Sequence, residues 1–345
     1  MNTLQALQIT WFALWAVLWA VYFMLDGFVL GTAMLQPFLA KNENERLATV
    51  EIVGPVWNGN EVWLITAGGA TFAAFATTYA LMFSYLYTAL LLLLFSLIIR
   101  GVSLEFRGKV AVPGWKKIWD LGFQVSSLLI ALLLGVAFGN IFEGLPMDAA
   151  GYHGNLLTLL NPYGLVTGVL FVALFVVHGA IYTGIKTSGA ISERALALAG
   201  KAWLVLLAVA VIFLAHTALV TRLYENYISA PVFLVVPLAA VAALVLIKLF
   251  LVRSQALKAF AASCVTIVMV AFTGIVGLFP NLIPSSIDTT YSLTIYNSSS
   301  SQLTLTIMTV VALIFVPIVI VYKIWVYRLF RDKISPEALS GEKAY

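Results

Sequence analysis

The segment IVGPVWNGNEVWLITAGGATFAAF, residues 52–75, decides how many times the chain crosses a membrane. It contains Asn58, Asn60 and Glu61, and a hydropathy profile alone would reject it as a span. Without this span, the basic loops at 41–46 and 100–117 would lie on opposite sides of the membrane. Because positive charge is retained on the cytoplasmic side during insertion, we keep the segment as a polar spanning helix.

Apolar runs along the rest of the chain complete a set of nine spans. Most are close to the ~20 residues that a helix needs to cross ~30 Å of hydrocarbon. The predicted spans are 8–30, 52–75, 78–99, 120–142, 163–185, 202–221, 231–251, 259–280 and 304–326. With the N-terminus outside, all 19 Lys and Arg residues except Arg222 fall in inward connections or in the C-terminal tail. The sequence therefore predicts an all-α integral membrane protein with nine transmembrane helices and a cytoplasmic C-terminus.

The composition excludes a soluble globular protein. The chain is 62% hydrophobic and only 10% charged, whereas charged residues make up about a quarter of a soluble domain. The net charge of +4 is an insertion signal and gives no reason to expect nucleic acid as a partner. Residues 1–8 lack the basic region of a cleaved signal, so we expect the first helix to remain in the mature protein. The single cysteine, Cys264, is expected to be a small buried side chain.

The chain is predicted to be one integral-membrane domain, 1–345, with a weak internal repeat. Residues 135–146 (GVAFGNIFEGLP) and 274–284 (GIVGLFPNLIP) end the fourth and eighth spans with a similar pattern of glycine and proline. The repeat would then cover 1–146 and 160–286, two parallel four-helix bundles. The ninth helix, 304–326, would be peripheral.

Few ionisable groups lie within the predicted spans. Such groups are unfavourable in a bilayer, which makes them candidates for function. Asp26 and Arg100 have similar depth and opposite charge, so they form either a structural ion pair or a proton-handling site. Glu61 is the one ionisable group in the polar part of the second span, and its own helix offers it no Lys or Arg. Asp120 is expected to cap the start of the fourth helix, where a carboxylate meets unpaired backbone amides.

Two intramembrane histidines, His178 and His216, are candidate axial ligands of a haem. Both would have to lie at the same depth to bind one iron. At ~1.5 Å per residue, His178 lies ~22 Å below the outer end of its helix and His216 ~24 Å above the inner end of the next. In a span of ~30 Å their depths differ by ~16 Å. The spacing therefore disfavours a bis-histidine haem, and each histidine is expected to be a hydrogen-bonded packing residue.

Trp11, Trp15 and Trp19 are spaced four apart and form one stripe on the first helix. Such a stripe faces lipid, another helix, a partner subunit or a quinone tail, and spacing alone does not choose among them. Lipid or helix packing is the default interpretation.

The run at 54–70, GPVWNGNEVWLITAGGA, is too rich in polar and glycine residues to be an ordinary apolar transmembrane segment. Six shorter motifs accompany it in order over nearly the whole chain: 26–28 (DGF), 104–109 (LEFRGK), 135–140 (GVAFGN), 161–164 (NPYG), 284–286 (PSS) and 301–304 (SQLT). Together they resemble subunit II of the cytochrome bd quinol oxidases.

This resemblance implies a fold, a partner and cofactors that spacing cannot show. In the family, subunit I carries two haems b, one haem d and the quinol site, and subunit II has the same nine-helix fold and binds no haem. The complex oxidises quinol near the outer face, reduces O2 to water and draws protons from the cytoplasm. The chain is therefore expected to form a heterodimer in which it stabilises subunit I and lines access routes at their interface. The presence of a small single-helix subunit, and of a bound lipid or quinone, stays open.

The resemblance also implies site residues. Trp57, Asn58 and Trp63 match the region used for proton and oxygen access, with Asp26 and Glu61 as ionisable candidates. Family members often have aspartate at the position of Asn58. Asparagine cannot relay a proton by ionising, so it could only orient water, and Glu61 would take the ionisable role. Catalytic residues, haem ligands and metal ligands are not expected in this chain.

The alternative hypothesis is a secondary transporter of the inner membrane. A repeated helical bundle with few buried charges is typical of such carriers, which usually place polar groups near the midplane in both halves. Here the polar cluster is confined to the second span and has no counterpart in the sixth. This asymmetry favours the oxidase subunit.

Overall fold

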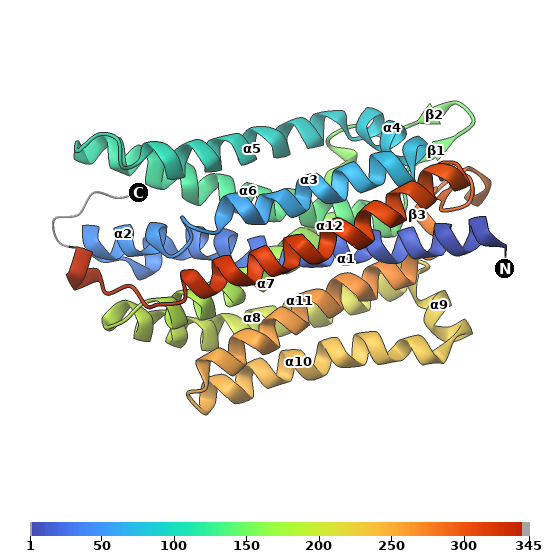
Figure 1. Ribbon diagram of the computed structural model, residues 1–345. Helices are drawn as coiled ribbons and strands as arrows, with labels where there is room; N and C mark the ends of the chain where they lie inside the picture. The colour runs from blue at the N-terminus through green and yellow to red at the C-terminus, as the bar shows by residue number, and fades with distance from the viewer. Residues whose placement is uncertain (1, 340–345) are drawn as a thin grey trace.

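Long helices that run side by side make up most of the computed structural model, which describes residues 2–339 (Figure 1). The α-helices are α1 (Thr3–Leu39), α2 (Glu43–Glu51), α3 (Trp57–Ala74), α4 (Ala76–Tyr85), α5 (Tyr87–Phe106), α6 (Pro113–Glu143), α7 (Pro162–Lys186), α8 (Ala190–Val220), α9 (Leu223–Ser229), α10 (Val235–Val252), α11 (Ala256–Leu278) and α12 (Gln302–Leu329). The short elements are β1 (Met147–Asp148), β2 (Gly151–Tyr152), β3 (Asn281–Ile283), β4 (Leu293–Thr294), and the 3-10 turns η1 (Thr158–Leu160), η2 (Pro231–Leu234), η3 (Thr289–Tyr291) and η4 (Pro336–Leu339). Helices suit a bilayer because they satisfy their backbone polar groups internally.

Eight helices within residues 2–339 are long and apolar enough to cross a membrane by themselves. They are α1, α5, α6, α7, α8, α10 with its leading turn η2, α11 and α12. The structure therefore agrees with the predicted all-α membrane protein. Helices α3 and α4 pass the same test only as a pair, and they are bent by 119° at the break between them.

The predicted third span, 78–99, is wrong as a single helix. The chain breaks at Phe75 and again at Leu86, so this region divides into α4 and α5. Hydropathy cannot show such a break, because both break residues are apolar and buried. The loop before α12 stabilises the first break: the backbone N–H of Ser300 donates to Ala74 O (2.9 Å), and its hydroxyl donates to Ala73 O (2.6 Å). These bonds satisfy carbonyls at the end of α3 that have no partner within the helix.

Helices α1 and α7 cross at the centre of the bundle through two glycines. A Cβ built on Gly31 would overlap the carbonyl oxygen of Phe175 and lie only 2.9 Å from the Cα of Gly179. Small residues let helix backbones approach closely, and the resulting van der Waals contact is a main source of helix attraction in lipid. The crossing therefore fixes the position of α1, which carries Asp26.

The tryptophan stripe of α1 packs against other helices. Trp11 and Trp15 are buried, and their ring N–H groups donate to Thr309 of α12 (3.0 Å) and Thr71 of α3 (3.0 Å). The sequence left lipid, another helix, a partner subunit and a quinone tail as possible environments of the stripe. At these two residues the structure shows packing against other helices. The stripe thereby holds α12 against α1 and α3 (Figure 1).

Helix α12 is the least buried of the long helices, with Leu305 its only fully buried residue. The two loops that carry the proposed repeat ends contact each other. The Leu145 N–H donates to Pro284 O (2.9 Å), and the Ser286 N–H donates to Leu145 O (2.9 Å). These bonds join the end of α6 to the connection that follows α11.

Candidate functional site

Three helices bring charged side chains together inside the bundle. Arg100 of α5 is completely buried, and its Nη1 lies 2.6 Å from Asp26 Oδ2 of α1. Its Nη2 also contacts Glu61 Oε1 of α3, whose side chain is 21% exposed. The structure thus brings Asp26 and Arg100 together and adds Glu61, for which the sequence offered no cation on its own helix. One guanidinium thus contacts two carboxyl groups, and we call this cluster the carboxylate–arginine triad.

Asn60, one residue before Glu61, ties three helices together. Its side-chain N–H group donates to Leu25 O of α1 (2.7 Å), and its carbonyl oxygen accepts from the Tyr327 hydroxyl of α12 (2.9 Å). A buried amide needs such partners because an unpaired polar group in an apolar interior is unfavourable. Asn60 therefore orients α3 so that Glu61 faces Arg100. The sequence marked Asn60 as polar but gave no sign of Tyr327 as its partner.

The remaining access candidates lie on two faces of α3. Trp57 and Trp63 are buried, each with 8% of its surface exposed, whereas Asn58 is exposed. Asn58 lines a polar pocket of about 490 Å³ between residues 54–59 and the inner part of α12, including Lys323. The structure therefore separates Asn58 from the triad, because its side chain points to the outer surface of the helix.

The exposed face of α3 carries large apolar residues together with polar and small ones. It contains Asn58, Val62, Ile65, Thr66, Gly69 and Phe72. A Cβ built on Gly68 or Gly69 would meet nothing within 4 Å. Polar groups and open glycines are typical of helix–helix contacts in membranes. This face is therefore suited to another helix from outside the chain.

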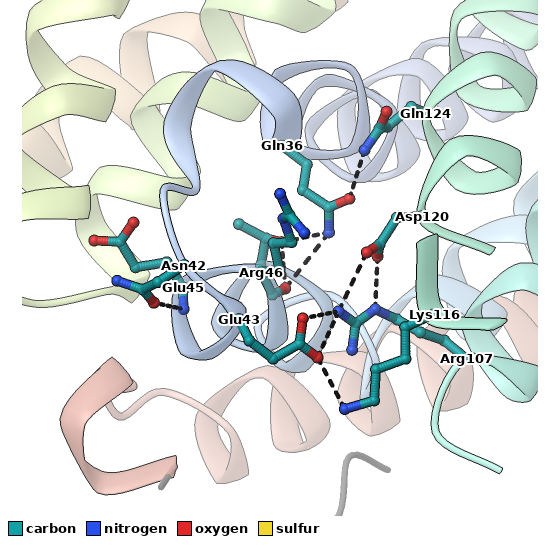
Figure 2. A network of polar contacts seen from close by, with 10 residues as sticks. Gln36, Asn42, Glu43, Glu45, Arg46, Arg107, Lys116, Asp120 and Gln124 are labelled. Carbon is teal, nitrogen blue, oxygen red and sulfur yellow. Dashed lines mark hydrogen bonds and ion pairs between the residues drawn. The ribbon is translucent and has the colours of Figure 1, made fainter. Parts of the chain in front are cut away.

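A second charged network lies at the end of the bundle where α5 meets α6 (Figure 2). Arg107 is buried, and its Nε lies 2.6 Å from Asp120 Oδ1 of α6. Its Nη2 also reaches Glu43 of α2 at 3.1 Å, and the same carboxylate accepts from Lys116 Nζ at 2.9 Å. The network joins the short helix α2 to the α5–α6 connection.

The expected role of Asp120 as a helix cap is wrong. Helix α6 begins at Pro113, so Asp120 lies in its interior and pairs with Arg107. The apolar run marked only the hydrocarbon part of this helix, and the helix itself continues into the polar region. Nearby, the Gln124 side chain donates to Gln36 (2.8 Å), which in turn donates to Thr49 (2.8 Å) (Figure 2). This glutamine pair was not predicted from the sequence, although two polar residues near span ends were a visible signal.

The Glu43 ion pairs predict a pH effect on stability. Partial burial raises the pKa of Glu43, but the hydrogen bonds and charges of Lys116 and Arg107 outweigh it and hold this pKa below the ordinary 4.5. A carboxyl with a lowered folded-state pKa stabilises the fold above its unfolded pKa, and this stabilisation is lost as the pH falls through the folded value. We expect Glu43→Gln to lower the free energy of unfolding at pH 7 by at most about 1 kcal/mol, because the group is partly exposed.

Thermal unfolding of both proteins over a range of pH measures this effect. The difference in Tm between wild type and Glu43→Gln should shrink as the pH falls below 4.5. Glu193→Gln, at an exposed position on α8, serves as the control and should leave Tm unchanged. A difference that grows on acidification would contradict the assignment.

The histidines are held by contacts that do not favour a haem. His178 Nδ1 lies 2.7 Å from Ser263 Oγ, and its Nε2 lies 3.0 Å from Met24 O, so both ring nitrogens are already engaged. His216 packs edge-on against Tyr163, with ring centroids 5.3 Å apart. Within residues 2–339, no group of three or more His, Cys, Asp or Glu side chains is arranged to hold a metal ion. His178 would have to lose a hydrogen bond to bind iron, so it does not fit as an axial ligand of haem.

Comparisons with known proteins agree with the motifs along the chain. Residues 7–330 match the family described as cytochrome bd terminal oxidase subunit II. The chain is 35% identical over 365 aligned residues to "Cytochrome bd-I ubiquinol oxidase subunit 2" of Escherichia coli (strain K12), with 96% of each chain covered. It is 34% identical to "Cytochrome bd ubiquinol oxidase subunit 2" of Bacillus subtilis (strain 168), covering 96% of this chain and 98% of that one.

A solved structure supports the fold independently. The bd oxidase from Geobacillus thermodenitrificans contains a chain that superposes with a TM-score of 0.78 at 18% sequence identity. The similarity covers 94% of this chain and 98% of that chain. At this sequence identity the structural similarity supports only the assignment of the fold.

Proposed function

Because the chain belongs to the family of cytochrome bd terminal oxidase subunit II, we propose that it acts as the second subunit of a quinol:oxygen oxidoreductase. The family membership confirms the resemblance drawn from the sequence. The observation that carries the function is the match of residues 7–330 to this family. The chain is a multi-pass protein of the bacterial inner membrane, and none of the comparisons favours a secondary transporter.

The topology is nine crossings with the N-terminus outside and the C-terminus in the cytoplasm. Helix α3 is the additional crossing, and α4 turns the chain back at the outer surface. The start of α1 and the end of α12 lie at opposite ends of the bundle (Figure 1), as an odd number of crossings requires. The distribution of Lys and Arg supports the orientation. The contact between Leu145 and Pro284 supports a repeat of 1–146 and 160–286.

The haem-bearing partner is subunit I, which carries two haems b and one haem d and takes electrons from quinol. This chain binds no haem in the proposal, which is supported by the engaged ring nitrogens of His178. Subunit I would dock on the exposed side of α3, where Ile65 is 73% exposed and Phe72 is 60% exposed. Lipid fills the remaining surface, and a small single-helix subunit is a further candidate partner.

Reduced-minus-oxidised spectra and quinol-dependent oxygen uptake test the function. Membranes from cells that express subunit I with this chain should show haem b and haem d signals and consume oxygen with quinol. Cells that express subunit I alone should lose most of the haem d signal and the oxygen uptake. Unchanged spectra and uptake without this chain would exclude the proposed role.

Proton access is tested at Glu61 with two variants. Glu61→Gln leaves Arg100 paired with Asp26, so the complex should still assemble with normal haem content. If Glu61 passes protons, its turnover should fall about tenfold, less than the ~10²-fold typical of positioned proton-transfer groups because water can bypass a relay. Asn58→Asp, added to Glu61→Gln, should restore little of the loss, because residue 58 lies on the outer surface of α3, away from Arg100.

Turnover is measured across the pH range at matched haem content. Glu105→Gln, at an exposed position of the same pocket, is the control for a general change in surface charge. Turnover of Glu61→Gln equal to wild type at every pH would remove the proton role. Glu61 would then serve only to hold α3 against Arg100.

A further inference from the structure

Lys323, near the inner end of α12, is a partly buried cation without a counter-ion in the described chain. Its Nζ lies against the backbone of α3 and would overlap a Cβ built on Gly59. Among residues 2–339, it forms no ion pair or hydrogen bond of its own. The carboxylate of Asp26 interacts with it only electrostatically, without direct contact. An ammonium group in a transmembrane helix is unfavourable unless it is paired or reaches water. An anion from outside the chain would supply the missing partner.

Two spaces of opposite character meet at Lys323. One is the polar pocket of about 490 Å³ described above, which is lined by Asn58, Tyr322 and the backbone of 54–59, with exposed Glu105 at one side. The other is an apolar groove of about 890 Å³ between α1, α3 and α12. Its walls include Leu14, Val17, Leu18, Val311, Phe315 and Ile320. A molecule with a polar head and an apolar chain would fit both spaces at once.

The groove is longer than the thickness of one leaflet of a bilayer. It runs along α12 from Met308 to Lys323, which corresponds to ~22 Å at ~1.5 Å per residue. One leaflet supplies about half of the ~30 Å hydrocarbon thickness. A single acyl chain from the inner leaflet therefore fits within the groove.

The charges at the inner end of the groove select the head group. Arg328 and Arg331 line this end together with Lys323, so three cations lie within one short stretch of α12 and its C-terminal extension. Basic pockets between transmembrane helices on the cytoplasmic side attract anionic lipid head groups. A neutral isoprenoid quinone would fill the groove but leave Lys323 without a counter-ion.

We propose that the α1–α3–α12 groove binds an anionic phospholipid of the inner leaflet, with its phosphate on Lys323 Nζ and one acyl chain along the groove. The site would join α12 to α1 and α3, which α12 contacts through few buried side chains of its own. Only the choice of the inner leaflet depends on the proposed orientation of the chain in the membrane. Lipid binding in detergent is independent of orientation and of oxidase turnover.

Native mass spectrometry of the purified, delipidated oxidase complex tests the site. The complex is titrated with phosphatidylglycerol or with phosphatidylcholine, and bound lipids are counted per complex. We expect one tight phosphatidylglycerol site that phosphatidylcholine does not fill. Lys323→Gln should weaken phosphatidylglycerol binding about fivefold, the effect of one basic residue near an anionic lipid.

Two further variants make the result specific. Ala312→Phe fills the groove without changing charge and should also remove the tight site. Lys201→Gln, at an exposed position on α8, should bind phosphatidylglycerol like wild type. Equal binding of both lipids, unchanged affinity in Lys323→Gln and Ala312→Phe, or a stoichiometric quinone that phosphatidylglycerol cannot displace would overturn the proposal. If Lys323→Gln fails to assemble, the phosphatidylglycerol affinity of Ala312→Phe is compared with that of Lys201→Gln, and this comparison tests the site.

Discussion

Arg100→Gln is expected to reduce the amount of assembled oxidase to less than about a tenth of the wild-type level. The substitution leaves Asp26 and Glu61 without a cation, and Asp26 has no access to solvent. Removing one partner of a buried ion pair costs about 3–5 kcal/mol, a large part of the 5–15 kcal/mol that stabilises a typical folded domain. Haem absorbance per milligram of membrane protein measures the assembled complex.

Neutralising the whole triad separates charge balance from lost contacts. The triple variant Arg100→Gln, Asp26→Asn, Glu61→Gln carries no unpaired charge at this site, so it should recover part of the assembled complex. Asp26→Asn alone should be milder than Arg100→Gln, because Arg100 keeps Glu61 as a partner. Arg253→Gln, at an exposed position after α10, controls for the loss of any arginine. A triple variant as defective as Arg100→Gln would show that the contacts matter and the charge balance does not.

Gly31→Ala should also reduce the accumulation of the folded subunit. The added methyl group would overlap the carbonyl oxygen of Phe175 in the facing helix, and a backbone atom cannot move aside as a flexible side chain can. Overpacking of a close-packed interior typically costs about 1–3 kcal/mol, and separating two helix backbones also removes their van der Waals contact. We expect several-fold less subunit in the membrane, measured by immunoblotting together with haem absorbance.

The matched control is Gly114→Ala at the start of α6. A Cβ at Gly114 meets nothing within 4 Å, so the same substitution adds a methyl group without a clash. Gly114→Ala should accumulate like wild type. Equal accumulation of Gly31→Ala and Gly114→Ala would show that α1 and α7 do not cross as closely as the structure indicates.

The sequence was sufficient to predict those properties that depend on local sequence patterns. Hydropathy indicated most of the membrane helices, and the run 54–70 with its accompanying motifs was enough to indicate the family. It also singled out Asp26, Glu61 and Arg100, because a charge inside an apolar run is visible without any structure. Each of these signals depends on residues that are near one another in the sequence.

The sequence alone determined that this protein is a helical membrane subunit of the cytochrome bd family, with charges in three of its helices. Only the tertiary structure decided that one guanidinium serves two carboxylates, that Asp120 pairs with Arg107, and that the chain breaks at Phe75 and Leu86. These features join residues from different helices, or depend on how a loop packs. They follow from how each helix is rotated and where it crosses its neighbours. Close packing at contacts such as Gly31 determines this arrangement, and the periodicity of a single helix does not predict it.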